Sequence, residues 1–153
     1  MSTHHAFRFF ALAFIFCQSA YAQSSLLQGR ASGEQVYNKV CVACHETGVA
    51  HAPKFGERAD WAPLIEEGQH VLTAHAWVGV RAMPARGGNA DLSLADFSRG
   101  VVYMARAAGA TWKDPDFRLL LAIVREADKR LTGSIREQQA MQRELHKIAK
   151  SAK

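Results

Sequence analysis

Two cysteines and a histidine lie within five consecutive residues, Cys41-Val42-Ala43-Cys44-His45. Thiols at positions i and i+3 of a helix share one face, so both sulfurs can reach one edge of the same planar molecule. The C-x-x-C-H spacing is that of covalent haem attachment, in which each thiol adds to one vinyl group and the adjoining histidine ligates the iron. We therefore predict one haem c, attached through Cys41 and Cys44, with His45 as the proximal ligand of the iron.

Three other uses of the cysteine pair remain open. A redox dithiol has the same C-x-x-C spacing, but it needs a βαβ context that the sequence does not provide. A zinc site needs one or two further soft ligands, and the third cysteine, Cys17, lies in a segment that we expect to be removed. A plain disulfide is compatible with an exported protein. The histidine that follows Cys44 favours haem over all three.

The iron of such a haem takes a second axial ligand, and we favour Met83 for that position. Met83 lies 38 residues after His45 and beside Pro84, in a segment without a helical pattern. A thioether on a loop can approach the open face of a haem. Thioether ligation raises the reduction potential relative to ligation by two imidazoles.

Five other residues are weaker candidates for the same position. Met104 falls within a predicted helix, where core packing explains it, and Met141 lies in the C-terminal tail. His51 is too close in sequence to His45 to cross easily to the opposite face. His70 and His75 would give bis-histidine ligation, although an isolated histidine is more often a surface or core residue.

The first 22 residues have the pattern of a secretory signal peptide. A region that ends at Arg8 precedes an apolar run over residues 9–17, and the small-residue site Ala20-Tyr21-Ala22 precedes Gln23. We predict cleavage after Ala22 and a periplasmic mature protein. The alternatives are an uncleaved anchor and lipidation of Cys17, and the bulky residues before Cys17 argue against lipidation.

Composition and charge exclude several classes of protein. With 48% hydrophobic and 22% charged residues, the chain is not expected to be disordered, and no apolar run is long enough for a multi-pass membrane protein. Residues 23–112 carry equal numbers of acidic and basic side chains, whereas residues 113–153 carry ten basic and six acidic ones. The net charge of +5 therefore belongs mostly to the tail. An exported protein rarely meets nucleic acid, so we predict no nucleic-acid partner.

The periodicity predicts an all-α fold, because no segment alternates at period two for long enough to form a strand. Ser32 and Gln35 have the spacing of a capping box for a helix that runs into Cys41. Asp60 is expected to cap a short helix, and another short helix is expected over residues 69–78. Ser93 is expected to cap a helix that ends near Gly109. Residues 47–58 and 79–91 contain the Gly and Pro residues typical of loops.

The tail, residues 113–153, is expected to form a basic helical extension. Asp114-Pro115 places a cap and a proline at a helix start, and Gly133 followed by Ser134 indicates a stop and a new cap. We predict two tail helices, or one helix that bends at Gly133. The tail is either a docking or oligomerisation segment, which tethers the protein to an oxidoreductase complex or an acidic membrane surface, or a solvated helical hairpin that packs on the rest of the protein.

The residues between Gly33 and Trp112 resemble the class I cytochromes c, most closely the small bacterial cytochrome c5-like type. The segments that carry the resemblance are Gly33-Glu34-Gln35-Val36-Tyr37, Cys41-Val42-Ala43-Cys44-His45, Ala52-Pro53-Lys54, Trp61-Ala62-Pro63, Ala82-Met83-Pro84-Ala85-Arg86-Gly87-Gly88, Leu92-Ser93-Leu94-Ala95-Asp96 and Tyr103-Met104. The c5-like proteins often carry a cysteine pair after the Gly-Gly loop. Asn89 and Leu92 stand at those positions here, so the resemblance implies no such disulfide.

The resemblance implies a small haem domain over residues 33–112, preceded by a linker over residues 23–32 and followed by the extension. It implies that the Pro53 carbonyl accepts a hydrogen bond from the His45 ring. It also implies that Trp61 packs near a haem propionate, although a core aromatic role for Trp61 is equally open. Gly33 would allow its helix to cross closely over the helix that contains Tyr103.

The function that follows from these expectations is one-electron transfer between redox partner proteins, without catalysis. Two alternatives remain. The chain could be a haem subunit of a larger oxidoreductase complex, docked through its C-terminal helices, or a haem enzyme or sensor with a labile sixth ligand. The sequence names neither the electron donor nor the acceptor.

Overall fold

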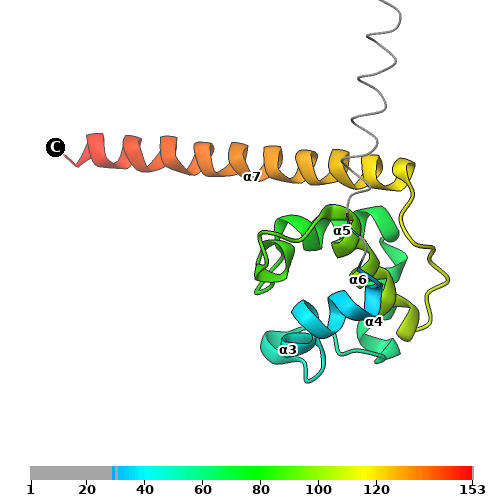
Figure 1. Cartoon of the computed structure of the whole chain (residues 1–153). Coiled ribbons are helices and arrows are strands. Elements are labelled where there is room, and N and C mark those ends of the chain that lie inside the picture. The colour runs from blue at the N-terminus through cyan, green and yellow to red at the C-terminus, as the bar shows by residue number, and fades with distance from the viewer. Residues whose placement is uncertain (1–28, 30, 153) are drawn as a thin grey trace, which may run out of the picture.

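The computed structural model describes residue 29 and residues 31–152 (Figure 1). The predicted signal peptide and most of the predicted linker lie outside the described residues. Every regular element in the described part is helical, which confirms the all-α prediction. The elements are α2 (Gly33–Val36), the π-helical turn η1 (Tyr37–Cys41), α3 (Val42–His45), the 3-10 turn η2 (Val49–His51), α4 (Arg58–Glu66), α5 (Gln69–Val78), the 3-10 turn η3 (Ala85–Gly88), α6 (Leu94–Ala107) and α7 (Phe117–Ser151).

The helix that carries the cysteines begins as the sequence predicts. The Ser32 side chain accepts a hydrogen bond from the Gln35 backbone, and the Gln35 side chain accepts one from the Ser32 backbone, which completes the capping box. The helix then widens at η1, where the backbone N–H of Val42 donates to the carbonyl of Tyr37, five residues earlier. It ends at His45, so the whole motif lies on one continuous helical segment.

Two glycines allow this segment to lie directly against α6. A Cβ atom on Gly33 would lie 2.4 Å from the Arg99 carbonyl oxygen and 2.8 Å from Cβ of Tyr103. A Cβ atom on Gly100 would lie 2.7 Å from Cγ1 of Val36. The expected close crossing at Gly33 is therefore present, and it fixes the cysteine-bearing helix against α6, the most buried of the described helices.

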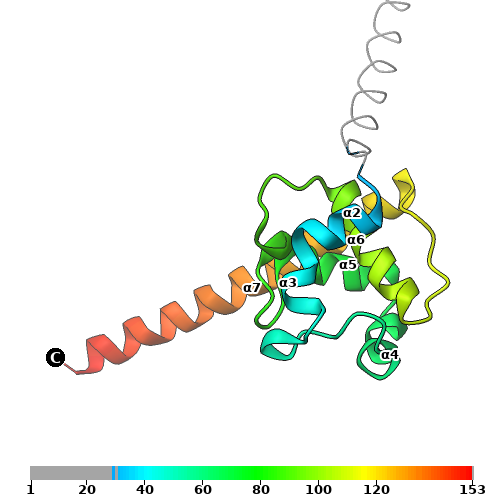
Figure 2. The same cartoon turned by 60° about the horizontal axis from the view of Figure 1, so that its bottom comes forward.

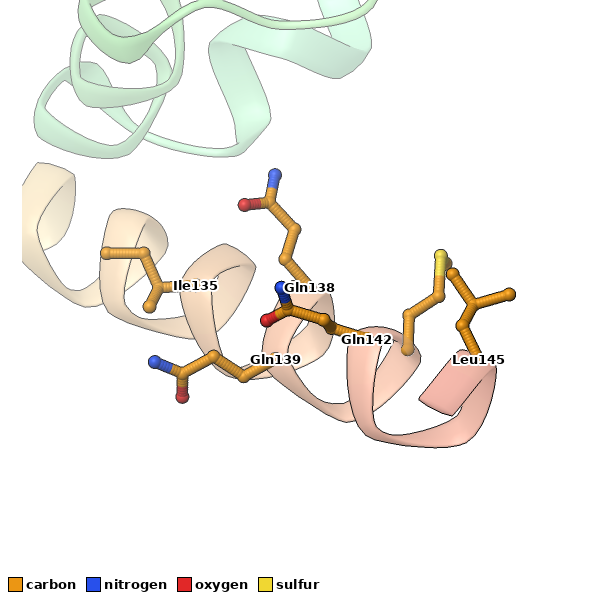
Figure 3. Close-up of a pocket in the computed structure, with 6 residues that line it drawn as sticks. Ile135, Gln138, Gln139, Gln142 and Leu145 are labelled. Atoms are coloured by element: carbon orange, nitrogen blue, oxygen red, sulfur yellow. The ribbon is translucent and has the colours of Figure 1, made fainter. Parts of the chain in front are cut away.

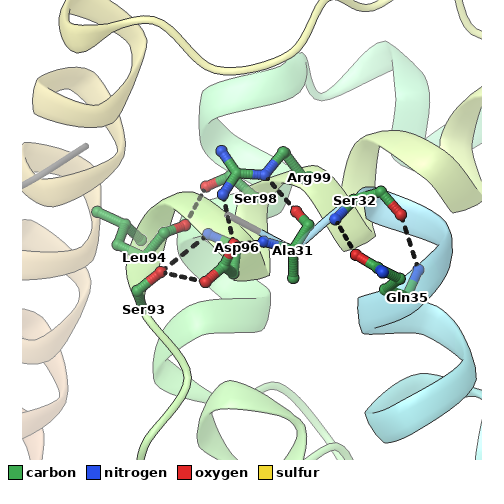
Figure 4. A network of polar contacts seen from close by, with 8 residues as sticks. All are labelled: Ala31, Ser32, Gln35, Ser93, Leu94, Asp96, Ser98 and Arg99. Atoms are coloured by element: carbon green, nitrogen blue, oxygen red, sulfur yellow. Dashed lines mark hydrogen bonds and ion pairs between the residues drawn. The ribbon is translucent and has the colours of Figure 1, made fainter. Parts of the chain in front are cut away.

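A polar network ties the chain before α2 to the start of α6 (Figure 4). The Asp96 carboxylate accepts hydrogen bonds from the Ala31 backbone at 3.0 Å and the Ser93 hydroxyl at 2.9 Å, and it pairs with Arg99. Arg99 Nε donates to the Ala31 carbonyl at 2.7 Å. Ser93 caps α6 as predicted, since its side chain accepts from the Asp96 backbone. This end of the crossing is thus held by the largely buried side chains of Asp96 and Arg99.

The tail forms one straight helix, α7, so the prediction of two helices or a bend at Gly133 was wrong (Figures 1 and 2). A glycine costs only about 1 kcal/mol in a helix interior, and no contact of Gly133 within 4 Å imposes a bend. The first turns of α7 pack on α5 through Leu120, Ile123 and Ala127, which are buried. The C-terminal part extends away from α2–α6 and the loops between them, which we call the helical body (Figure 2).

Two predicted helix caps were also wrong. The N-cap of α4 is Glu57, whose carboxylate accepts from the Ala59 backbone, and Asp60 instead accepts from the Lys54 backbone at 2.9 Å. The N-cap of α7 is Asp116 rather than Asp114, and its carboxylate accepts from the Leu119 backbone at 2.8 Å. Acidic residues two or three positions apart compete for the same cap, and the path of the incoming loop decides between them.

Candidate haem site

The two cysteines lie on the same helical segment but in different surroundings. Cys41 is the last residue of η1 and is buried, with Sγ 3.9 Å from the Val36 carbonyl and facing Gly100. Cys44 lies in α3 and is exposed. Both are free thiols, so the pair does not form the plain disulfide that the sequence left open. A planar group attached to both sulfurs would reach from the interior to the surface.

Burial also changes the acidity of the inner cysteine. Removal of Cys41 from water raises the pKa of its thiol to about 11, and the neighbouring Cys44 adds to this shift. Burial disfavours the thiolate because a charge loses its hydration there. Before any group is attached, Cys41 would therefore be a neutral thiol at physiological pH, unlike the activated thiolate of a redox dithiol.

His45 is held by the loop that follows it. Its ring atom Nδ1 lies 2.9 Å from the Pro53 carbonyl oxygen, the contact that the resemblance implies. Its own carbonyl accepts a hydrogen bond from the Phe55 backbone at 2.6 Å. With Nδ1 as the donor to Pro53, Nε2 carries the lone pair that can bind a metal. The ring is buried, so its orientation is fixed by backbone atoms rather than by solvent.

Trp61 packs beside this histidine. Its ring centroid lies 6.1 Å from that of His45, and the side chain is buried in α4. The indole N–H donates to the Lys54 carbonyl at 2.8 Å. Trp61 thus stabilises the same loop, residues 46–55, that positions the His45 ring. This arrangement fits the core aromatic role that the sequence left open, because the N–H already has a partner inside the protein.

Met83 lies on a tight loop between α5 and α6. Its backbone forms two hydrogen bonds with Val80, at 3.1 and 2.9 Å, and Arg81 between them has a left-handed φ of 53°. The loop continues into η3, where Gly87 approaches Cγ1 of Val40 on the cysteine-bearing segment. Met83 packs against the same hydrophobic cluster that contains Cys41 and Trp61. The fold therefore brings the Met83 loop to the cluster in which the motif is embedded.

The other sixth-ligand candidates lie in different settings. Met104 is buried within α6, and Met141 is exposed on the projecting part of α7. His75 pairs with Glu67, with 3.2 Å between Nδ1 and the carboxylate. His51 and His70 are exposed. Met83 is the candidate that combines loop geometry with contact to the cluster around the motif.

Sequence reasoning missed several residues that shape this region. Phe55 stacks on Tyr103 with 5.3 Å between ring centroids, and it lies 4.5 Å from the ring of Tyr37. The guanidinium of Arg86 lies 4.5 Å from the centroid of Trp77, on the helix before the Met83 loop. Phe55 is a large apolar residue two positions after Pro53, and this position could have indicated that it packs near the His45 loop. The Arg86 contact has no sequence signal, because it depends on a left-handed backbone at Arg86.

The residues present fit a haem rather than the other groups considered. Within the described part of the chain, no three His, Cys, Asp or Glu residues gather as a metal site, which excludes the zinc alternative there. The βαβ context of a redox dithiol is missing as well, since no strand occurs among the described residues. The paired thiols, the backbone-oriented imidazole and the adjoining apolar cluster match the donors and surroundings that a covalent haem needs.

A family model described as cytochrome c oxidase, cbb3-type, subunit III matches residues 28–104. The chain belongs to the cytochrome c family. It is 35% identical to cytochrome c-555 of Chlorobaculum tepidum over 101 residues, which cover 63% of this chain and 94% of that protein. It is 42% identical to cytochrome c5 of Azotobacter vinelandii over 67 residues, which cover 42% of this chain and 81% of that protein. These relatives confirm the resemblance to the small c5-like cytochromes.

A solved structure of the electron transfer complex of nitrite reductase with cytochrome c contains a chain that is 43% identical to this one. That likeness covers 53% of this chain and 99% of the other, with a TM-score of 0.49. Cytochromes c of this family carry haem c, and this chain accordingly carries one haem c, attached covalently through two thioethers. None of the helices in the described ranges combines the length and apolar character needed to cross a bilayer.

Proposed function

We propose that this chain is a periplasmic monohaem cytochrome that carries single electrons between redox proteins and is not itself an enzyme. The observation that supports this most directly is the fixation of His45, whose ring is oriented by the Pro53 carbonyl and covered by Trp61. Outer-sphere electron transfer needs ligands that move little when the charge of the metal changes. A buried imidazole held by backbone atoms meets that requirement.

We propose that Cys41 and Cys44 would hold the haem through thioether bonds and that His45 and Met83 would ligate its iron. The haem supplies a one-electron couple between ferric and ferrous iron. Nε2 of His45 is the nitrogen available to the iron, because Nδ1 is engaged with Pro53. The hydrogen bonds between Val80 and Met83 fix the backbone from which the thioether of Met83 extends. Trp61 and the apolar cluster exclude water from the His45 side of the site.

The exposure of Cys44 supports a route for electrons. Cys44 is exposed whereas Cys41 is buried, so the attached edge of the haem would reach the surface beside α3. Residues 23–112 carry no net charge, and two propionates would make the region that surrounds the haem mildly acidic. Redox encounters are typically small and transient, so we expect weak and salt-dependent binding of partners there.

The decisive experiment combines the mass and the optical spectrum of the protein, exported from a host that attaches haem c. We expect the mass of the chain from Gln23 onward plus one haem, a low-spin spectrum and the far-red ferric band typical of thioether ligation. A mass equal to the polypeptide alone would refute the haem assignment. A mass that includes the first 22 residues would refute the cleavage site.

The Met83→Ala variant tests the axial ligand, with Met141→Ala as the matched control. Met141 is 68% exposed on α7, so its replacement should leave the spectrum unchanged. Met83→Ala should abolish the far-red band and allow carbon monoxide to bind the reduced protein rapidly. If the band survives in Met83→Ala, another residue is the ligand. If the wild type itself binds carbon monoxide rapidly, the chain is a ligand-binding haem protein rather than a carrier.

A further inference from the structure

The projecting part of α7 carries an apolar stripe that the helical body does not cover. Its exposed apolar side chains are Leu131, Ile135, Met141, Leu145 and Ile148. They recur at intervals of three, four or six residues, so they lie on one side of the helix. A shallow surface hollow here is bordered by Ile135, Gln138, Gln139, Met141, Gln142 and Leu145 (Figure 3).

The stripe continues the same face by which α7 packs on the helical body. Leu120 and Ala127 are buried against α5, and they are seven residues apart. Seven-residue steps from Ala127 lead to Ser134, Met141 and Ile148. A second series, four residues further on from Ala127, contains Leu131, Gln138 and Leu145. Two interleaved series with a period of seven are the pattern of a coiled-coil seam, here sustained for three heptads.

The charges of α7 argue against a lipid surface as the occupant of this stripe. Lys129, Arg136, Arg143 and Lys150 also recur every seven residues, on the side of the helix opposite the stripe. A helix that lies on an anionic membrane places basic residues beside its apolar face, where they reach the headgroups. Here these four basic side chains would point into solvent, whereas Arg130, Glu137 and Glu144 flank the stripe, so the flank is not predominantly basic. The stripe is better suited to another helix.

We propose that the occupant is α7 of a second copy of this chain, in an antiparallel two-helix coiled coil with twofold symmetry. In a parallel pair, residues 117–127 of the partner would have to occupy the space that α5 already fills beside Leu120. In an antiparallel pair, the end of the partner's helix at Ser151 comes level with the point where α7 leaves the helical body near Leu131. The two projecting segments then overlap along most of their length.

This register pairs complementary side chains across the seam. Leu131 of one copy faces Ile148 of the other, Ser134 faces Leu145, and Gln138 faces Met141, and the twofold axis repeats each layer. The small Ser134 thus lies opposite the large Leu145, and the flexible Met141 can fill the space beside Gln138. The four basic residues of the opposite face stay on the outside of the pair, far from one another. The basic faces of the two copies therefore make no like-charged contact, whereas Glu137 of one copy lies close to Glu144 of the other beside the seam, and this repulsion weakens the pair.

The dimer should be weak and dependent on concentration. The overlap of residues 131–148 is about 27 Å long, at 1.5 Å per residue. Two of its three distinct layers contain a polar residue, Ser134 or Gln138. Short coiled coils with polar seam positions gain specificity at the expense of stability. We therefore expect monomers when the protein is diluted and dimers when it is concentrated.

The test is sedimentation equilibrium of the full haem-loaded protein, followed at the haem absorption. Leu145→Glu places a charge in two layers of the dimer at once, and it should weaken association by about tenfold or more. Ala140→Glu introduces the same charge on the opposite side of α7 and should leave association within about twofold of wild type. A wild type that stays monomeric at every concentration would overturn the proposal. Equal weakening by the two variants would do the same.

Orientation and the lipid alternative are tested separately. With both native cysteines in thioethers, a spin label on Lys150→Cys reports one distance within the dimer. Antiparallel helices place position 150 level with position 129 of the other copy, so the labels should be about 30 Å apart or more along the axis. A distance below about 20 Å would overturn the antiparallel arrangement. Binding of monomers to phosphatidylglycerol vesicles, lost in Leu145→Glu and kept in Ala140→Glu, would assign the stripe to a membrane surface.

Discussion

Replacement of Gly33 by alanine tests how tightly the cysteine-bearing helix is held. The new Cβ atom would lie 2.4 Å from the Arg99 carbonyl oxygen, about 1 Å short of an ordinary van der Waals contact. The obstacle is backbone of α6, so no side-chain rotation relieves it. Arg99 is also tied to the Ala31 carbonyl and to Asp96, and Gly100 lies against Val36 on the next turn. The two helices would therefore have to separate together.

The magnitude follows from two opposing contributions. Forced insertion of a methyl group into a close-packed contact costs about 1–3 kcal/mol. Alanine gains about 0.5–1 kcal/mol over glycine within a helix, which offsets part of that cost. We expect a net loss of about 1–2 kcal/mol in the free energy of unfolding. That loss corresponds to an increase of about 5- to 30-fold in the unfolding equilibrium constant.

Urea unfolding of the haem-loaded protein, followed by haem absorbance and by far-UV circular dichroism, measures this loss. Gly133→Ala is the matched control, because it is the same chemical change in a helix with nothing within 4 Å of the new Cβ atom. It should leave the stability unchanged or raise it by up to about 1 kcal/mol. If Gly33→Ala unfolds at the same urea concentration as wild type or above it, the close crossing does not constrain the fold as we argue.

Three further predictions concern α7 and the cysteines. Leu120→Ala should lower the free energy of unfolding by about 2–5 kcal/mol, because Leu120 is fully buried. Leu131 is 48% exposed, so Leu131→Ala should change the free energy of unfolding of the monomer by less than about 0.5 kcal/mol. Equal urea midpoints for the two variants would show that α7 does not stabilise the helical body. In the haem-free chain, iodoacetamide should modify Cys44 before Cys41, whose pKa is raised to about 11 by burial. Equal alkylation rates of the two cysteines at pH 8 would contradict the burial of Cys41. In the unfolded chain the Cys41 thiol releases its proton near its ordinary pKa of 9.0, whereas the folded state keeps it up to about pH 11. The haem-free fold should therefore lose stability as the pH rises from about 9 to about 11.

The sequence predicted those parts of the fold that depend on residues close together in the chain. The cap at Ser32 and the cap at Ser93 depend on side chains three residues apart, and both form as expected. The helix over residues 69–78 has the predicted bounds. Both cysteines and the histidine likewise lie within five consecutive residues, so the haem could be inferred without any knowledge of the fold.

The features that sequence reasoning missed depend on contacts between distant segments or on small energy differences. The continuity of α7 through Gly133 rests on a cost of only about 1 kcal/mol, which the flanking helical turns overcome. The partner of the Trp61 N–H is a backbone carbonyl, and carbonyls carry no sequence signature. The approach of Gly87 to Val40 requires a left-handed backbone that residue identity alone does not specify.

The wide turn at Tyr37–Cys41 has a consequence for how much length variation the protein tolerates. Compared with a regular α-helix, a π turn contains one additional residue and so rotates everything after it by about 100° about the axis. Val36 before the turn can therefore face Gly100 while the histidine after it reaches the Pro53 carbonyl. Deletion of a single residue between positions 37 and 41 would leave a well-formed helix whose thiols and imidazole point elsewhere. Such a variant should fold into helices and yet emerge colourless from a cell that matures cytochromes.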